Sequence, residues 1–205
     1  MRLREFRILA SVLSSEVGWC WPLLLLRCPF SKNSISTATP WAGRRDDEAR
    51  FAQRLCLSAA LYRGLIDRMG KERAFEAMRR ILVSIGCQEQ LSNVSSLSPG
   101  GADAMDRLWA FYEFTGIGGV GQFVDRSLVK ETDDLLQYEV RDCFFDRSYR
   151  EVGMPELTQF FCEVDTEFFP QAFPEFEFHR GSSLDNTVAH GEDHCDFIFE
   201  RKRES

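Results

Sequence analysis

The spacing of apolar residues changes near Gly121, and this change limits the folds open to the chain. Before Gly121, apolar side chains recur every three or four residues, which is the period of a helix buried on one side. After it, residues 121–144 alternate between apolar and polar side chains, which is the period of a strand. Helices followed by an antiparallel sheet predict an α+β fold rather than repeated βαβ units.

The expected elements follow from this pattern. The helical half predicts an antiparallel helix pair over about 46–69 and 74–85, a loop over 92–101 and a short helix over 102–114. The second half predicts strands over 121–130 and 135–144 with a turn at 131–134, then 175–180, 185–190 and 195–201. A helix beginning at Pro155 is inserted between the two groups of strands, because proline suits the first turn of a helix.

Charge divides the 205-residue chain at about residue 45. Residues 1–45 hold seven Lys/Arg and two Asp/Glu, a net charge of +5, so the remainder carries −12 of the total of −7. We expect 1–45 to be a poorly ordered leader or targeting segment and 46–205 to be a single domain. An acidic domain argues against nucleic-acid binding, which needs clustered Lys and Arg.

Localisation is predicted from the cysteines and the N-terminus. Seven cysteines, an odd number without a CxxC pair, are not a disulfide framework and favour a reducing, cytoplasmic compartment. The apolar run VGWCWPLLLL (17–26) is too short to span a bilayer, so we expect no membrane partner. Arg2, Arg4 and Arg7 leave a transit peptide, and hence an organellar location, as the alternative.

The helix from Pro155 carries two stripes of side chains. Its core stripe consists of Leu157, Phe160, Phe161, Val164 and Phe168. Thr158, Cys162, Asp165 and Phe169 form a second stripe on its flank, where a thiol and a carboxylate one turn apart could line a pocket. The alternative is a buried cysteine beside a solvated aspartate, which is common in proteins.

The stretch HGEDHCDFIFE (190–200) raises the question of a metal site. His190, His194 and Cys195, with Cys143 or Cys162 as a fourth ligand, match no standard zinc spacing, so we expect no metal. We interpret 191–193 as a turn and 195–199 as a strand. Cys195, Phe197 and Phe199 then share one face of that strand, and Asp196 lies on the other with Ile198.

Cofactor binding is also not expected. TGIGGVG contains a formal G-x-G-x-x-G, Gly116, Gly118 and Gly121. The dinucleotide fingerprint needs a strand before it and a helix after it, and here the predicted order is reversed.

Three cysteine motifs in order resemble those of the L-2-amino-thiazoline-4-carboxylic acid hydrolase family. They are DCFF (142–145), GMPELTQFFCEVD (153–165) and TVAHGEDHCDFIF (187–199). The helix pair LYRGLIDRMGKERAFEAMRRIL is also similar to that of the family, and together the resemblance covers about three quarters of the chain. Val188 departs from the family's leucine, and RGSSLDN (180–186) is longer than its usual link. The motifs also fit a distant likeness to vinyl-reductase-type domains, which bind ligands without necessarily being catalytic.

The resemblance implies a hydrolase that opens a small cyclic amidine bearing a carboxylate, on a route to cysteine. It implies catalytic roles for Cys143, Cys162, Asp165, Cys195 and Asp196, and substrate binding by Arg180 and Thr187. Either water activated by a base attacks the sp² carbon, or a thiolate attacks first and forms a covalent intermediate. The competing function is a small-molecule-binding domain of the same fold without catalysis. Apart from the substrate, the one partner left open is a second copy in a homodimer.

Overall fold

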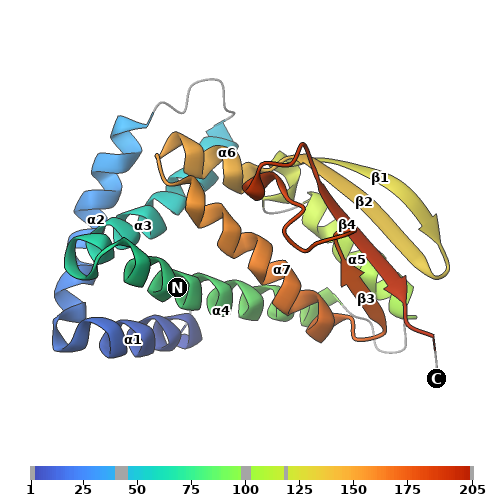
Figure 1. Ribbon diagram of the computed structural model, residues 1–205, viewed down its shortest axis with the longest axis horizontal. Helices are drawn as coiled ribbons and strands as arrows, with labels where there is room; N and C mark the ends of the chain where they lie inside the picture. The colour runs from blue at the N-terminus through green and yellow to red at the C-terminus, as the bar shows by residue number, and fades with distance from the viewer. Residues whose placement is uncertain (1–2, 40–45, 98–102, 118–119, 204–205) are drawn as a thin grey trace. The chain divides into compact units, whose positions relative to one another are not determined.

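The computed structural model describes residues 3–39, 46–97, 103–117 and 120–203. Its contacts divide the chain into two compact units, Met1–Gly86 with Ser148–Phe160 and Cys87–Arg147 with Phe161–Ser205. The first unit is helical, and the second holds a four-stranded antiparallel sheet (Figure 1). The predicted α+β class is therefore confirmed.

The first unit begins with α1 (Leu3–Val17), the 3₁₀ turn η1 (Gly18–Cys20) and α2 (Trp21–Ala38). It continues with α3 (Asp46–Met69) and the start of α4 (Lys71–Leu97). Residues 87–147 belong to the second unit, and the first unit resumes with a segment that includes the 3₁₀ turn η3 (Pro155–Thr158). The predicted helix pair corresponds to α3 and α4.

Residues 3–38 are helical, whereas the sequence led us to expect a poorly ordered leader. Leu24, Cys28 and Ile35 of α2 are buried, and α2 packs on α3 within the first unit. The approach is close at Gly64, where an added Cβ would lie 2.6 Å from Leu24 Cδ1. Residues 40–45 of the expected leader lie outside the described residues.

The same N-terminal segment bears on the membrane question. By length and composition, Leu3–Ala38 is apolar enough to cross a membrane, with a window of mean hydropathy 1.5 that is 22% buried. The segment is not one straight helix, because Gly18 adopts a φ of 68° in η1 and separates α1 from α2. Glycine reaches positive φ without strain, so the break between α1 and α2 depends on the glycine at position 18.

The second unit is built on a sheet of order β1-β2-β4-β3, with every neighbouring pair antiparallel. Its strands are β1 (Asp125–Thr132), β2 (Leu135–Asp142), β3 (Phe176–His179) and β4 (Cys195–Arg201). Helix α5 (Ala104–Ile117), the 3₁₀ turns η2 (Gly121–Phe123) and η4 (Val188–His190), and most of α7 (Gln159–Ala172) complete it.

The two faces of this sheet differ. In the register, Val140 lies opposite Cys195 and Tyr138 opposite Phe197, and these residues belong to the face that we call the inner face. Rings from both helices cover it, since Tyr112 of α5 lies 4.9 Å from Tyr138 and Phe169 of α7 lies 4.7 Å from Phe199, centroid to centroid. The outer face carries the alternate residues of β2 and β4, namely Gln137, Glu139, Asp196 and Ile198.

Three local predictions were wrong. Helix α6 (Phe144–Glu151) begins where we expected the end of a strand, and the backbone amides of Phe145 and Asp146 bond to the Cys143 sulfur at its start. The expected strand at 185–190 contains η4, which ends at Gly191 with a φ of 100°. Helix α4 continues to Leu97, through most of an expected loop.

Candidate functional site

Asp165 and Arg180 form an ion pair beside the aromatic residues of the inner face. Asp165 lies on α7, and its Oδ2 accepts a hydrogen bond of 2.7 Å from Arg180 Nη2, just after β3. The arginine is 1% exposed, and its Cζ lies 4.2 Å from the centroid of the Phe197 ring. The ring of Tyr138 stacks on the ring of Phe197, with 4.7 Å between their centroids.

This environment changes the acidity of the groups in it. Burial raises the pKa of Asp165 to about 6, although the Arg180 guanidinium acts in the opposite direction by favouring the carboxylate. Burial also raises the pKa of Tyr138, and the negative charge of Asp165 adds to that rise. Asp165 is therefore mainly ionised at neutral pH but close enough to its pKa to exchange a proton.

Cys162 connects this pair to the surface through a short chain of contacts. Its thiol donates to Thr187 Oγ1 at 3.7 Å, and Thr187 Oγ1 lies 2.8 Å from His190 Nδ1. Thr187 is fully buried, whereas His190 is exposed and its Nε2 lies 3.9 Å from Asp185 Oδ1. The imidazole of His190 is therefore linked to the Cys162 thiol through the hydroxyl group of Thr187.

Cys195 and Cys143 are held by backbone amides. Val188 N–H donates to Cys195 Sγ at 3.1 Å, and the amides at the start of α6 do the same for Cys143. Such donors favour a thiolate, but burial outweighs them in all three cysteines of the motifs. It raises the pKa of Cys143 to about 11 and of Cys162 to about 12, and it raises that of Cys195 as well.

The predicted site residues do not form one group. Asp165 and Arg180 act on the pKa of both Cys162 and Cys195, and Cys195 acts on the pKa of Cys143. Asp196 is not among them, because its side chain lies on the outer face and accepts from Gln137 Nε2 at 3.4 Å. The two residues expected to bind substrate, Arg180 and Thr187, are 1% and 0% exposed.

Two residues of this region were missed in the sequence. Tyr138 looked like an ordinary strand residue, and His190 was treated as incidental to a turn. The spacing of Thr187 and His190, three residues apart, was the available signal, since it places the two side chains on one side of a single helical turn. Nothing local marks Tyr138, whose place depends on pairing with a strand 59 residues later.

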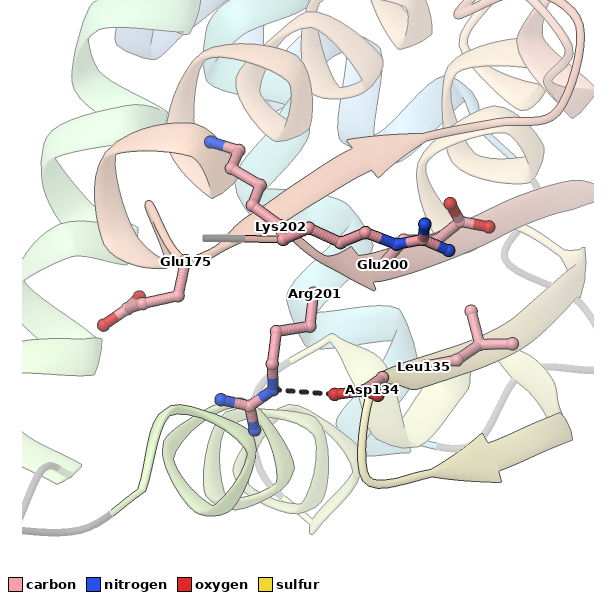
Figure 2. Close-up of a pocket in the computed structure, with 7 residues that line it drawn as sticks. Asp134, Leu135, Glu175, Glu200, Arg201 and Lys202 are labelled. Atoms are coloured by element: carbon pink, nitrogen blue, oxygen red, sulfur yellow. Dashed lines mark ion pairs between the residues drawn. The ribbon is translucent and has the colours of Figure 1, made fainter. Parts of the chain in front are cut away.

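A cavity of the second unit lies elsewhere, at the far end of β4 (Figure 2). It has a volume of about 750 Å³ and is lined by Asp134, Leu135, Glu175, Glu200, Arg201, Lys202 and Arg203. Figure 2 shows Arg201 turned towards Asp134, 3.3 Å from Nε to Oδ1, and its other nitrogens bond to Asp103. None of the predicted site residues lines this cavity.

The fold and the inner face define a class: an α+β protein in which a buried arginine pairs with a partly exposed aspartate beside a thiol. A sequence model of the L-2-amino-thiazoline-4-carboxylic acid hydrolase family matches residues 48–199, so the chain belongs to this family. The resemblance drawn from the cysteine motifs is thereby confirmed, and the family name supports hydrolase activity. No curated protein matches the chain.

One solved structure is similar along the whole chain. It is a mutant H-NOX protein from K. algicida in its Fe(II) unliganded form, with 13% sequence identity and a TM-score of 0.37. The match covers 100% of this chain and 98% of that one. At this level of similarity nothing about function is carried over.

Proposed function

We propose that the protein hydrolyses a small cyclic amidine bearing a carboxylate, with Asp165 as the general base. The observation that carries this proposal is the Asp165–Arg180 pair, in which burial raises the pKa of the carboxyl to about 6. A base with a pKa just below neutral pH is ionised in the resting protein and still accepts a proton in the transition state. Arg180, being buried, acts by holding and orienting that carboxylate.

The state of the thiols favours water over cysteine as the nucleophile. A cysteine with a pKa of about 12, like Cys162, has roughly one thiolate in 10⁵ molecules at pH 7. Covalent catalysis needs the thiolate, whereas a neutral thiol serves as a wall or a hydrogen-bond donor. We therefore assign Cys162, Cys195 and Cys143 to the shape and polarity of the site.

The proposed reaction balances without a further reactant. Asp165 takes one proton from water, and the resulting hydroxide forms a bond to the sp² carbon between nitrogen and sulfur, while the π pair of the C=N bond moves to its nitrogen. Asp165 gives its proton to that nitrogen. Asp165 then takes the proton of the new hydroxyl group, so that a C=O bond forms as a ring bond from the carbon breaks. The departing heteroatom keeps the electron pair of that ring bond and takes the proton from Asp165, so the product differs from the substrate by one water.

A second candidate function, binding without turnover, is favoured by one observation. Arg180 and Thr187, the residues expected to meet the substrate, are almost wholly buried. A domain that only binds a heterocycle needs a closed site and no base. The two functions therefore differ in whether the charge of Asp165 is needed after binding.

Turnover assays on the purified full-length protein separate these functions. We expect release of ring-opened product from 2-aminothiazoline-4-carboxylate, and a loss of about 10²-fold or more in Asp165→Asn. Glu167→Gln is the matched control, since Glu167 is an exposed carboxylate on the same helix. Binding of the heterocycle without turnover, equally tight in the wild type and in Asp165→Asn, would establish the binding function instead.

A further inference from the structure

Three metal-binding side chains meet on the outer face of the sheet. They are Glu139 of β2, His194 just before β4, and Asp196 of β4. One ligand atom from each lies within 4.8 Å of the other two, and this is the one such group among the described residues. His194 Nε2 is already 3.6 Å from Asp196 Oδ2.

Strand geometry explains why these three residues meet. His194 and Asp196 are two residues apart at the start of β4, and the contact between their side chains shows that they lie on the same side. Glu139 lies directly opposite Asp196 in the antiparallel register of β2 and β4. Like charges placed opposite each other destabilise a sheet, by about 0.2–1 kcal/mol on the scale of cross-strand pairs, unless a cation lies between them.

Neighbouring side chains hold each carboxylate by one oxygen. Arg141 Nη2 donates to Glu139 Oε2 at 2.7 Å, and Gln137 Nε2 donates to Asp196 Oδ1 at 3.4 Å. Asp196 Oδ2, the second oxygen, is the one on the side of His194. Hydrogen bonds of this kind orient carboxylate ligands around metal ions.

We propose that Glu139, His194 and Asp196 bind a divalent transition-metal ion. One imidazole and two carboxylates suit zinc, cobalt, manganese or iron(II), and three protein ligands leave positions open to water. Ligand atoms around tetrahedral zinc are about 3.3 Å apart, as follows from bonds of about 2.0–2.1 Å. The three partly exposed side chains therefore need to close by at most about 1.5 Å, given their present separation of up to 4.8 Å.

This site is separate from the proposed hydrolytic one. Cys195 lies between His194 and Asp196 in sequence, but its side chain belongs to the inner face. The ion would join β2 to β4, the two central strands of the sheet. Its predicted effect is on the stability of the sheet, and the proposal stands whether or not the protein hydrolyses a cyclic amidine.

Cobalt titration of the full-length protein, freed of metal by a chelator, tests the proposal. Co²⁺ bound to nitrogen and oxygen shows weak visible bands, whereas bound thiolate adds an intense near-ultraviolet band, which matters because the chain has seven cysteines. We expect one Co²⁺ per chain without the thiolate band, displacement by Zn²⁺, and a higher melting temperature with the ion. Asp196→Asn and Glu139→Gln should each weaken binding by about 10-fold or more, at least the loss seen for outer partners of a metal.

The outer face itself provides the control. Glu177 of β3 lies opposite Glu200 of β4, and His179 Nε2 is 3.8 Å from Glu200 Oε1, but these groups do not converge as the first three do. Glu177→Gln should therefore leave cobalt binding unchanged. His194→Gln covers the case in which a strand variant fails to fold, because His194 precedes β4 and is 41% exposed. A thiolate band, a Kd weaker than about 1 mM, or equal binding by the three ligand variants and the wild type would overturn the proposal.

Discussion

The two faces of the sheet in the second unit are formed by the same strands and have opposite chemistry. On the inner face, Cys195 and Tyr138 lie beside the Asp165–Arg180 pair, under rings from α5 and α7. On the outer face, Asp196 and Glu139 are partly exposed and lie directly opposite each other in the register. Cys195 and Asp196 are adjacent in β4, yet Cys195 lies beside the proposed base Asp165, whereas Asp196 belongs to the proposed cation site.

This difference shows that sequence proximity is a poor guide to a shared role. Cys195 and Asp196 are neighbours in the family motif, and both were expected to be catalytic. Strand alternation places them on opposite sides of the sheet. Burial also differs between them, since the Cys195 thiol is buried, which raises its pKa, whereas the Asp196 side chain is partly exposed.

The largest expected effect compares the packing of the two faces. Phe199 is fully buried against Tyr138, Phe169 and Phe178, so Phe199→Ala should lower the free energy of unfolding by about 3–5 kcal/mol. Ile198 on the outer face is partly exposed, and Ile198→Ala should cost less than half of that. Chemical denaturation of both variants measures the difference. Equal losses would mean that both faces are packed alike.

A second comparison tests how Arg180 acts on Asp165. Arg180 lowers the pKa of this carboxyl against the rise caused by burial, so Arg180→Met should move the pKa further above 6. Activity, which needs the carboxylate, should then begin to fall at a higher pH than in the wild type. A pH profile of kcat/KM reports this shift. An unchanged profile would show that Arg180 does not act on the catalytic carboxyl group.

The third comparison concerns the thiol beside that pair. Because burial raises the pKa of Cys162 to about 12, it is protonated, and a serine supplies a similar hydrogen-bond donor. Cys162→Ser should therefore lower kcat by less than about 10-fold, below the usual range for a residue that moves a proton. Cys87→Ser, in the same unit, serves as the control. Complete loss of activity, with a substrate adduct on Cys162 in the wild type, would assign the thiol as nucleophile.

The smallest expected effect belongs to the outer face. Without metal, Asp196 and Glu139 repel each other across the ladder, so Asp196→Asn should raise the free energy of unfolding by about 0.2–1 kcal/mol in chelator. Urea denaturation detects this gain. With a saturating divalent ion the sign should reverse, because the variant loses a ligand. A loss of stability under both conditions would show that Asp196 acts through its hydrogen bond from Gln137.

Periodicity predicted the parts of this structure that depend on local spacing. The helix pair, the strands β1, β2 and β4, and the separation of Cys195 from Asp196 all follow from residues a few positions apart. The turn η4 was missed because its course depends on Gly191 at positive φ and on two amides that bond to the Thr187 carbonyl. Helix α6 was missed because DCFF continues the alternation of the preceding strand.

The chemistry of the two faces depends on contacts between distant residues. Asp165 and Arg180 are 15 residues apart, on a helix and after a strand, and no spacing rule joins them. Glu139 and Asp196 meet only through the register of β2 and β4. The sequence could therefore nominate Asp165 and Asp196 but could not tell that they lie on opposite faces.

The pH dependence of kcat/KM tests most directly whether the inner face carries the chemistry. Asp165 must be deprotonated to act as a base, and burial raises its pKa to about 6. The account predicts that kcat/KM rises with pH up to about 6 and then levels off, with a fall of about tenfold per pH unit on the acid side. The residual activity of Asp165→Asn should lack this limb. A wild-type profile without a limb near pH 6, or the same limb in Asp165→Asn, would contradict the account.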